Sequence, residues 1–376
     1  MKVIVLGAGK IGSVIAEDFS NTGAQIASGD IDLNKAKSIS KKVEGDALVF
    51  DTSDYSSMVK TLSEYDLVLG ALPGDYGYRA LEASIEAKKS VVDVSFTPEN
   101  PMALDKAARN AGVTIIPDCG VAPGLSNLLV GYGASKLEKV EEAKIMVGGI
   151  PEHRVPPLDY TVTWSTDGLI DEYIRDVSIV KGGKVVQVPA LSGLENIEFP
   201  GVGTLEAFYT DGLRTLVNSF PDVTNLSEKT LRYPGHVEKL KLLKELGFFS
   251  EDPVMVQGIE IIPKFVSARV FERSLTIPEV GDLLAMMVEV SGEKDEKRKR
   301  HRYTVLEYID HDTGVSAMAR TTAYTASIVA KILVEGRIQK KGVVPMEKLG
   351  ADHRFVKTVF EELGKRNVEI KETENN

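Results

Sequence analysis

The sequence VIVLGAGKIG at residues 3–12 decides how the first part of the chain folds. Four apolar residues precede glycines with the spacing Gly-x-Gly-x-x-Gly, and apolar residues at helical spacing follow at Val14, Ile15 and Phe19. This order predicts a strand, a tight turn and a helix whose first N–H groups face a phosphate, as in dinucleotide-binding folds. We expect the whole turn to contact the cofactor: Gly7, Ala8, Gly9, Lys10, Ile11 and Gly12.

An acidic residue closes the second apolar run. Asp30 follows Gly12 by 18 residues, where a carboxylate can accept hydrogen bonds from both ribose hydroxyls of an adenosine. The same carboxylate would repel a 2′-phosphate, so the sequence predicts NAD rather than NADP. The alternative is a glycine-rich turn that binds no ligand.

Length and composition place the chain among two-domain globular proteins. It has 376 residues, of which 43% are hydrophobic and 27% charged, and its net charge of −10 argues against binding to nucleic acid or to an anionic membrane. Met1 leads directly into the first strand, and no apolar run reaches membrane-spanning length, so we expect a cytoplasmic protein.

Metal and disulfide chemistry are not expected. Cys119 is the single cysteine, which excludes an internal disulfide and a cysteine-based metal cluster. Four of the histidines show no metal-ligand spacing: His153, His301, His311 and His353. We expect no metal site.

Strands and helices alternate through the first third of the chain. Runs rich in β-branched residues at 47–50, 67–72, 90–94 and 113–116 alternate with helical patterns such as 55–63 and 78–87. The pattern predicts an α/β fold with a Rossmann-type doubly wound parallel sheet, whose ligands bind beyond the carboxyl ends of the strands. The strand tails supply further cofactor candidates: Asp51, Thr52, Ala71, Leu72, Pro73, Asp93 and Ser95.

The pattern changes after residue 125. We expect a mixed α+β substrate domain over 126–317, with strands at 143–147, 159–164, 185–188 and 257–262. Strands at 284–290 and 302–309 should form a hairpin around a charged turn, which interleaves acids with bases and so is not typical of a nucleic-acid patch. Helical patterns at 321–334 and 355–364 predict that 318–376 returns to complete the dinucleotide-binding domain of 1–125.

With these segments in order, the chain resembles the saccharopine dehydrogenase and lysine 6-dehydrogenase family along nearly its whole length. The residues that carry the resemblance are 7–12, 71–73, 93–96, 118–124 and 230–236, and the stretch 199–212 is similar to the lysine 6-dehydrogenase branch. Two positions depart from saccharopine-forming members. Ala122 stands where they usually carry Asp, and His236 where they usually carry Phe, which favours a simpler amine substrate.

The resemblance implies NAD-dependent oxidation of the side-chain amine of L-lysine, giving ammonia and a semialdehyde that cyclises. It also implies a homo-oligomer, a dimer or a dimer of dimers, with a small amine or amino acid as its partner. Two alternatives stay open. One is reductive condensation of an aldehyde with an amine, as in saccharopine or carboxynorspermidine formation, and the other is a non-catalytic NAD-binding sensor.

Site residues follow from the resemblance and from side-chain chemistry. Arg232 can hold an α-carboxylate through two parallel hydrogen bonds, or form an ordinary ion pair. A lysine amine must lose a proton before hydride leaves, so a general base is expected. His236 and Asp118 are the catalytic candidates, with a packing residue and a turn cap as their respective alternatives.

The remaining candidates are assigned to substrate or cofactor binding. Glu206 and Asp211 are carboxylates in a glycine-flanked loop, suited to holding an amine. We expect Ser95, Phe96 and Tyr209 to contact the substrate as well, and Pro123 to contact the cofactor. Cys119 has no adjacent base, so we do not expect it to act as a nucleophile.

Overall fold

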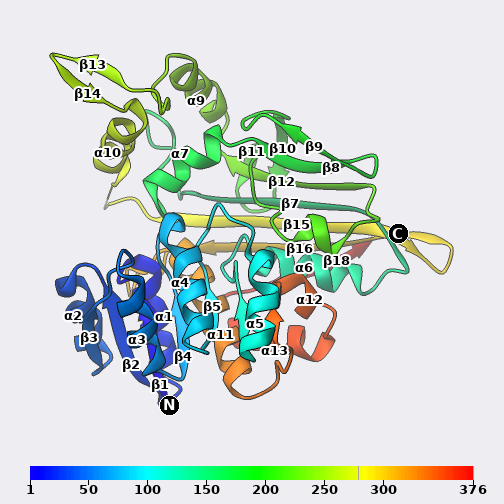
Figure 1. Cartoon of the computed structure of the whole chain (residues 1–376). Helices are drawn as coiled ribbons and strands as arrows, with labels where there is room; N and C mark the ends of the chain where they lie inside the picture. Colours follow the sequence, from blue (N-terminus) through cyan, green and yellow to red (C-terminus); the bar gives the residue numbers. More distant parts are fainter. Residues whose placement is uncertain (278, 376) are drawn as a thin grey trace. The chain divides into compact units, whose positions relative to one another are not determined.

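The computed structural model describes residues 1–277 and 279–375, which form two compact units (Figure 1). Unit 1 comprises Met1–Ser135 and Ala319–Glu369, and unit 2 comprises Lys136–Met318 together with residues 370–375. After unit 2 the chain returns to unit 1 over Ala319–Glu369. The final residues differ, because 371–375 pair with a strand of unit 2.

Unit 1 is a parallel sheet with helices packed around it. The sheet order is β17-β6-β5-β4-β1-β2-β3, and every neighbouring pair is parallel. The predicted doubly wound sheet is therefore confirmed. Its strands are β1 (Lys2–Leu6), β2 (Gln25–Asp30), β3 (Asp46–Val49), β4 (Leu67–Gly70), β5 (Ser90–Asp93), β6 (Thr114–Ile116) and β17 (Gly342–Val343).

The helices of unit 1 begin where the sequence provides caps. Asp32, Asp54 and Asp352 each accept a hydrogen bond from a backbone N–H of the helix that follows. The helices are α1 (Lys10–Ser20), α2 (Leu33–Lys42), α3 (Tyr55–Ser63), α4 (Gly74–Glu86), α5 (Asp105–Ala111), α6 (Leu125–Ala134), α11 (Ala317–Val334), α12 (Met346–Leu349) and α13 (His353–Gly364), with a 3-10 turn at Pro101–Leu104.

Unit 2 is built on a mixed sheet of order β10-β11-β12-β7-β15-β16-β18, with β8 and β9 attached to β12. Its strands are β7 (Lys139–Pro151), β8 (Val177–Lys181), β9 (Lys184–Val188), β10 (Glu195–Phe199), β11 (Gly203–Tyr209), β12 (Asn225–Arg232), β15 (Asp282–Lys294), β16 (Lys297–Tyr308) and β18 (Lys371–Asn375). Its helices are α7 (Thr166–Ile174), α8 (Leu216–Ser219), α9 (His236–Glu245) and α10 (Pro263–Leu275), and a separate hairpin pairs β13 (Val254–Val256) with β14 (Ile259–Ile261).

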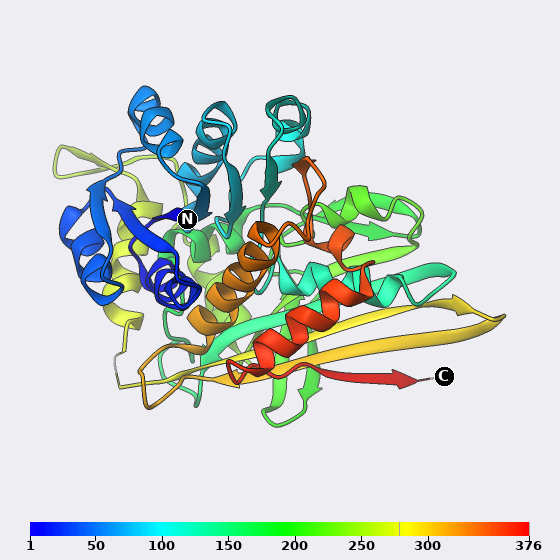
Figure 2. The same ribbon diagram turned by 90° about the horizontal axis from the view of Figure 1, so that it is seen from below.

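The predicted charged hairpin is confirmed. β15 and β16 pair antiparallel up to Lys294 and Lys297, and the two residues between them, Asp295 and Glu296, have φ of 51° and 60°. Positive φ at both central positions is the geometry of a two-residue hairpin turn. Figure 2 shows this long hairpin with β18 beside it.

One predicted strand of unit 2 is wrong and another is shorter than predicted. Residues 159–164 form no strand: Asp159 lies in a turn with φ of +53°, and the Val162 N–H and the Thr161 hydroxyl both donate to the carbonyl of Leu275. The predicted strand 257–262 is shorter, since Gln257 and Gly258 adopt positive φ and form the turn between β13 and β14.

The end of the chain is tied to the first helix of unit 1. Arg366, just after α13, donates from Nε and Nη2 to the two carboxylate oxygens of Asp18 in α1, at 2.7 and 3.1 Å, and from Nη1 to Glu362 at 2.9 Å. Ser327 of α11 also donates to Asp18. Figure 2 shows α11 and α13 side by side, consistent with the ion pair between Lys331 and Glu362.

We expect Arg366→Ala to destabilise unit 1 by about 2–4 kcal/mol, because it leaves the mostly buried Asp18 carboxylate without its cation. Lys365→Ala is the matched control: Lys365 binds the same Glu362 at 2.8 Å but is 68% exposed, so its loss should cost less than about 1 kcal/mol. Urea unfolding followed by far-ultraviolet circular dichroism measures both. Equal effects of the two changes would contradict the assignment.

Candidate functional site

The turn after β1 leaves no room for side chains where α1 crosses it. Gly7 has φ of +95°, and a Cβ on Gly7 would lie 2.4 Å from the carbonyl oxygen of Ala71. A Cβ on Gly12 would lie 1.8 Å from the carbonyl oxygen of Gly7. At Gly9, in contrast, a Cβ would meet nothing within 4 Å, and no side chain caps the helix that follows. The first turn of α1, with Lys10 and Ile11, thus offers its N–H groups to a ligand.

Asp30 lies at the carboxyl end of β2 and binds the same turn. Its Oδ2 accepts a hydrogen bond from the N–H of Ala8 at 2.7 Å, and its Oδ1 accepts one from Asp32 at 2.8 Å. The carboxylate is therefore fixed beside the glycine turn, whereas the neighbouring Ile31 is 66% exposed.

Asp51 and Thr52 follow β3, at the edge of the sheet. The Asp51 carboxylate accepts a hydrogen bond from the Ser53 N–H at 2.8 Å, and its bonds to Ser53 lower the pKa of Asp51. Arg79 of α4 binds the Ser53 carbonyl at 3.1 Å. Because β2 separates β3 from β1 in the sheet order, these residues lie one strand further from the glycine turn than Asp30.

The tails of β4 and β5 pack on each other. Ala71, Leu72 and Pro73 lead from β4 into α4, whose first residue, Gly74, has no room for a Cβ because the Phe96 carbonyl would lie 2.3 Å away. Ala71 also donates its N–H to Leu6 at 2.8 Å, which holds this tail against β1.

The Asp93 carboxylate is occupied locally. It is 3% exposed and accepts hydrogen bonds from the Ser95 hydroxyl at 2.9 Å and the Ser95 N–H at 3.1 Å. Ser95 is buried too, and Phe96 is half-buried. The hydrogen bonds between Asp93 and Ser95 therefore fix the backbone at the end of β5.

Asp118 follows β6 in the left-handed region, with φ of +51°, and is 5% exposed. The next residue, Cys119, donates its N–H to the Asp93 carbonyl at 2.8 Å, so the ends of β5 and β6 meet. Burial, and then the charges of Asp93 and Asp118, raises the pKa of the Cys119 thiol. A thiol in this environment is not activated, which agrees with the sequence interpretation.

The loop after Asp118 folds back on itself. The Ala122–Pro123 peptide bond is cis, and Gly120 donates its N–H to the Pro123 carbonyl at 3.1 Å. Leu125, the first residue of α6, donates to Gly120 at 2.8 Å. Pro123 therefore belongs to a compact turn at the carboxyl edge of the sheet.

Unit 2 holds a buried guanidinium at the end of β12. Arg232 is 2% exposed; its Nε donates to the Tyr173 hydroxyl at 3.2 Å and its Nη1 to the Leu231 carbonyl at 2.9 Å. Its guanidinium lies over the ring of Tyr160, 4.8 Å from the centroid, and Nη2 lies 3.5 Å from Glu172 Oε2. Within the part of the chain that the structure describes, Nη2 donates no hydrogen bond.

The pKa of Arg232 keeps it charged. Burial by itself would lower the pKa of the guanidinium, but Tyr173 and Glu172 outweigh it and raise this pKa above its ordinary value. Glu172 is in turn held by a hydrogen bond from the Thr230 hydroxyl. The cluster therefore contains a permanent buried cation beside one carboxylate.

His236 begins α9 and is fully buried. Its Nδ1 lies 2.9 Å from the Leu158 carbonyl, which can only accept, so Nδ1 carries the proton. Its Nε2, 3.0 Å from the Tyr173 hydroxyl, then accepts from Tyr173. Burial, and then the charge of Arg232, lowers the pKa of His236 from 6.5 to about 3.

The Glu206 carboxylate binds the backbone at the start of α9. It is 4% exposed, and its two oxygens accept hydrogen bonds from the backbone N–H groups of Gly235 at 2.8 Å and Val237 at 2.6 Å. Both bonds hold the start of α9, where the helix has free N–H groups. Glu206 thus caps α9, and its predicted role in holding the amine stays a prediction.

Tyr209 and Asp211 do not lie opposite Arg232 in the sheet. β11 pairs with β12 so that Glu206 faces Arg232 and Tyr209 faces Lys229. The Lys229 ammonium lies 4.7 Å from the Tyr209 ring centroid and 2.6 Å from Glu195. Asp211 is half-buried just beyond β11. The structure therefore places these two residues at some distance along the sheet from the guanidinium.

Sequence reasoning missed the residues that hold Arg232: Tyr160, Glu172 and Tyr173. Glu172 and Tyr173 lie on α7, and Tyr160 lies in the segment 159–164, which was predicted as a strand. Their position in the sequence gives no sign that they meet, because 59 residues separate Tyr173 from Arg232. A buried arginine needs polar partners, so the prediction that Arg232 binds substrate could have indicated that such partners exist, but not which residues they are.

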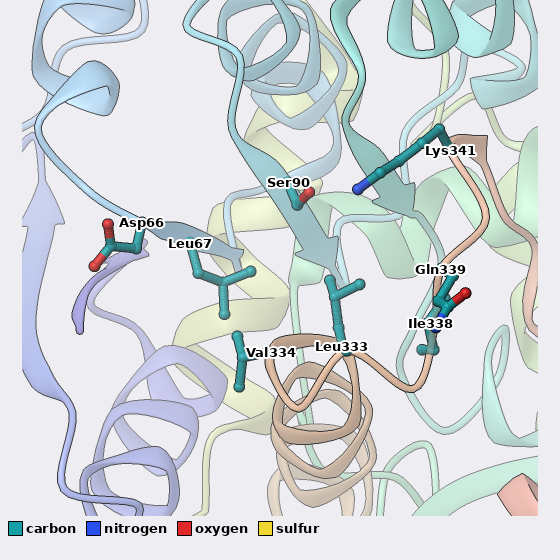
Figure 3. A pocket seen from close by; sticks show the side chains of 9 residues that line it. Asp66, Leu67, Ser90, Leu333, Val334, Ile338, Gln339 and Lys341 are labelled. Carbon is teal, nitrogen blue, oxygen red and sulfur yellow. The ribbon is translucent and has the colours of Figure 1, made fainter.

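A cavity of about 340 Å³ lies elsewhere in unit 1 (Figure 3). Asp66 directly precedes β4 and Ser90 begins β5, so the cavity is at the amino ends of these strands, and Leu333 and Val334 at the end of α11 form another wall. Parallel α/β sheets bind their ligands at the opposite edge. None of the predicted site residues lines this cavity.

In residues 1–277 and 279–375, no group of three or more His, Cys, Asp or Glu side chains is placed to hold a metal ion. Over the same ranges, no helix combines the length and the apolar character needed to cross a membrane.

Two family models match the chain. The saccharopine dehydrogenase NADP binding domain matches residues 3–116, and the saccharopine dehydrogenase C-terminal domain matches residues 120–368. Unit 1 thus contains a nucleotide-cofactor-binding domain.

Known proteins agree with these matches. Saccharopine dehydrogenase (NADP(+), L-glutamate-forming) of Pyricularia oryzae is 28% identical over 286 residues, which cover 71% of this chain and 63% of that enzyme. Carboxynorspermidine synthase of Vibrio cholerae serotype O1 is 23% identical, with 94% of this chain and 93% of that one covered.

A solved structure shows the same fold. The apo saccharopine dehydrogenase (L-Glu forming) of Saccharomyces cerevisiae superposes with a TM-score of 0.82 over 100% of both chains, at 18% identity. The match to the Pyricularia oryzae enzyme spans less than two thirds of that enzyme's length. The two family models together cover nearly all of the present chain. The family expected from the sequence is confirmed: this chain belongs to the saccharopine dehydrogenase family.

Proposed function

We propose that this chain is an NAD-dependent dehydrogenase that oxidises the side-chain amine of L-lysine to the semialdehyde and releases ammonia. One observation carries the proposal. The buried guanidinium of Arg232 keeps Nη2 without a hydrogen bond among the described residues, and its ion-pair partner Glu172 is 3.5 Å away. A permanent buried cation with spare donors is suited to a substrate carboxylate.

The reaction balances with the groups named. The protonated amine loses one proton to a base, and its ε-carbon then loses a hydride, which leaves a protonated imine that water hydrolyses to the aldehyde and an ammonium ion. NAD, when bound, accepts the hydride. The protein must supply the first deprotonation, because a lysine amine with a pKa near 10.4 is mostly charged at neutral pH, a deficit of about 4.6 kcal/mol at pH 7.

Asp118 is the group that we propose to accept this proton or to hold the ammonium. It follows β6 of the parallel sheet, on the edge where the glycine turn lies, and it is buried. Its φ of +51° is uncommon for a residue other than glycine, and such conformations persist where the surrounding structure enforces them, often at functional sites.

His236 is better interpreted as a positioning residue than as the base. Its Nδ1 donates to Leu158 and its Nε2 accepts from Tyr173, so both nitrogens are occupied and the ring stays neutral. The Tyr173 hydroxyl therefore has its lone pairs free for the Nε–H of Arg232. His236 thereby orients Tyr173, which orients the guanidinium.

We propose NAD as the cofactor, although the matching family model and the Pyricularia oryzae relative carry NADP in their names. The Asp30 carboxylate is fixed on the glycine turn by the Ala8 N–H at 2.7 Å, and a phosphate on the 2′ oxygen would meet its charge. The residue after it, Ile31, is exposed and supplies no cation.

Reductive condensation of an aldehyde with an amine is the second candidate. The match to carboxynorspermidine synthase favours it, since that match covers 94% of this chain and 93% of the relative. The two candidates differ in the nitrogen donor of the reductive direction. We expect the chain to use ammonia with the semialdehyde and NADH, whereas condensation would require a second amino compound.

For the cofactor, we expect the double change Asp30→Ser with Ile31→Arg to shift the ratio of kcat/KM for NAD to that for NADP by at least about 100-fold toward NADP. The change removes the Asp30 carboxylate, which would repel the 2′-phosphate of NADP, and adds an arginine that can bind this phosphate. Asp30→Asn is the matched control, because it keeps an acceptor for the Ala8 N–H but loses the charge, and it should shift the ratio only in part. Initial rates with NAD and with NADP are measured for these two variants and for wild type. A wild type that already uses both cofactors equally would refute the role of Asp30.

For the substrate, we expect wild type to form NADH with L-lysine and only slowly with cadaverine, which lacks the carboxylate. Arg232→Ala should lower kcat/KM for lysine about 30- to 1000-fold and change cadaverine turnover little, because about 2–4 kcal/mol of charged hydrogen bonding serves only the carboxylate. The kcat/KM of Arg232→Lys for lysine should lie between those of wild type and Arg232→Ala, since lysine keeps the charge but cannot donate two parallel hydrogen bonds.

Arg175→Ala is the control for that comparison. Arg175 lies next to the end of the same helix as Tyr173 and pairs with Asp171 at 2.6 Å, so it tests the general loss of an ion pair in α7. It should leave both substrates nearly unaffected. If Arg232→Ala damages lysine and cadaverine turnover equally, Arg232 holds structure, and the carboxylate binds elsewhere.

For pH, we expect His236 to make folding less stable in mild acid. The pKa of His236 is about 3 in the folded state and near the ordinary 6.5 in the unfolded state. The neutral, buried ring therefore contributes its full share of the folding stability above about pH 6.5, and this contribution is lost as pH falls toward 3. Between pH 7.5 and 5, wild type should lose about 2 kcal/mol more stability than His236→Asn. Urea unfolding at several pH values measures this.

The same variants separate positioning from base catalysis. His236→Asn and His236→Gln both remove the titrating group, so both should flatten the stability profile, even if their stabilities at pH 7.5 differ. The pH profile of kcat/KM should keep its shape in either variant. A loss of activity toward acid pH that disappears with His236 would instead assign the base to this residue, because a general base stops working once it is protonated.

A further inference from the structure

The cavity at the amino ends of β4 and β5 is a second place in unit 1 where a small molecule can bind. Its volume of about 340 Å³ lies near the lower end of the roughly 300–1,000 Å³ that small-molecule sites occupy. The glycine turn follows the carboxyl end of β1, so it belongs to the opposite edge of the same sheet. A ligand in this cavity is therefore separate from the proposed reaction.

The order of the strands explains why the cavity exists. α11 ends beside the start of β4, whereas β17, the next strand in the chain, lies beyond β5 and β6 in the sheet. Residues 335–341 must therefore cross the amino ends of β5 and β6. On the β6 side they are held, because the Thr114 hydroxyl donates to the Lys340 carbonyl at 2.8 Å and the Gly342 N–H donates to Val113 at 2.9 Å.

The part of this segment that lines the cavity is not held in the same way. Within residues 1–277 and 279–375, the backbone N–H groups of Ile338, Gln339 and Lys341 donate no hydrogen bond. The space between this segment and the two strands is the cavity. Backbone N–H groups that have no protein acceptor are available to a ligand that carries acceptor oxygens.

Apolar side chains form the middle of the cavity wall. Leu67 is 1% exposed, Ile338 6% and Leu333 9%, and Val334 at the end of α11 is 39% exposed. Figure 3 shows Leu67, Leu333 and Val334 between Asp66 on one side and Lys341 on the other. A wall of this kind favours contact with a hydrocarbon chain over contact with water.

Polar groups at one end of the cavity can hold an anion. Lys341 and Gln339 are exposed, and neither side chain has a partner among the described residues. The Ser90 hydroxyl accepts the Thr114 N–H at 3.1 Å, which leaves its own proton to be donated. Figure 3 shows the Lys341 side chain extending toward Ser90. A carboxylate at this end would accept hydrogen bonds from an ammonium and from a hydroxyl.

The other end of the cavity repels an anion. Asp66 lies there, and its Oδ2 accepts a hydrogen bond from the Lys2 N–H at 2.8 Å, so the carboxylate is fixed in place. An elongated ligand with one carboxylate is therefore oriented, with its charge toward Lys341 and its chain along the apolar wall.

We propose that this cavity binds a small aliphatic carboxylate. The hydrocarbon chain would contact Leu67, Leu333 and Val334, and the carboxylate would bind Lys341 and Ser90. An α-amino acid with the same chain fits less well, because its ammonium, next to the carboxylate, would lie beside the Lys341 ammonium.

Saturation-transfer difference NMR of the full chain, with hexanoate as the probe, tests this. Wild type should bind hexanoate with a Kd of roughly 1 mM or below, as expected for a ligand of this size. L-Norleucine should bind at least about 10-fold more weakly, as should 1-hexanol, which has the chain but no charge.

Two variants locate the site, and a third is the control. Lys341→Gln should weaken hexanoate binding at least about 10-fold, because it removes the cation. Val334→Phe should weaken it by a similar factor, because the larger ring fills the cavity. Lys340→Gln is the matched control: Lys340 is the neighbouring exposed lysine, but its side chain does not line the cavity, so binding should be unchanged.

Arg232→Ala separates this cavity from the buried cation of unit 2. Hexanoate should still bind that variant, and loss of binding would place the carboxylate at Arg232 and overturn the inference. The inference is also wrong if hexanoate does not bind wild type, or if 1-hexanol or L-norleucine binds as tightly as hexanoate.

Amide hydrogen exchange in wild type decides the matter if the variants at Lys341 or Val334 misfold. Saturating hexanoate should slow exchange at the amides of residues 338–341, because the ligand covers this segment, and should leave residues 254–261 of unit 2 unchanged. Exchange at 338–341 that does not respond to hexanoate would overturn the inference.

Discussion

Unit 1 depends on the absence of two side chains where α1 crosses the turn after β1. A Cβ at Gly12 would overlap the Gly7 carbonyl, and one at Gly7 would overlap the Ala71 carbonyl. Any larger residue would push α1 away from the sheet and separate the helix start from the tails of β2 and β4. The hydrogen bond from Ala8 to Asp30 is made across the same turn, so the contact that packs the helix also fixes the carboxylate beside it.

Unit 2 depends on a directed series of hydrogen bonds. The Leu158 carbonyl can only accept, which makes His236 donate from Nδ1 and accept at Nε2, so Tyr173 donates to His236 and accepts from Arg232. Each member has one permitted role, and the guanidinium is therefore held in one orientation. Glu206 supports the same arrangement from the backbone, because it holds the first turn of α9, which carries His236.

Local patterns predicted most of unit 1 and less of unit 2. The glycine spacing, the strand and helix alternation and the helix Tyr55–Ser63 are consequences of neighbouring residues, and the structure has them where the sequence indicates. Residues 159–164 look like a strand because they alternate, yet their hydrogen bonds go to Leu275, more than a hundred residues away. Glu206 and His236 were assigned by chemical type, and their roles depend on which backbone groups lie beside them after folding. No sequence pattern reports those neighbours.

The discontinuity of unit 1 has a consequence for biosynthesis. Residues 1–135 leave the ribosome first, but α11, β17 and α13, which complete the unit, come after residue 316. Roughly 180 residues must be translated in between, which takes on the order of 10–40 s at about 5–20 residues per second. During that time, while unit 2 is being made, β6 lacks its neighbour β17 and Asp18 lacks Arg366. Unit 1 must therefore close after translation has passed it, and a nascent chain of this kind holds an unfinished nucleotide-binding sheet while the second unit is still being synthesised.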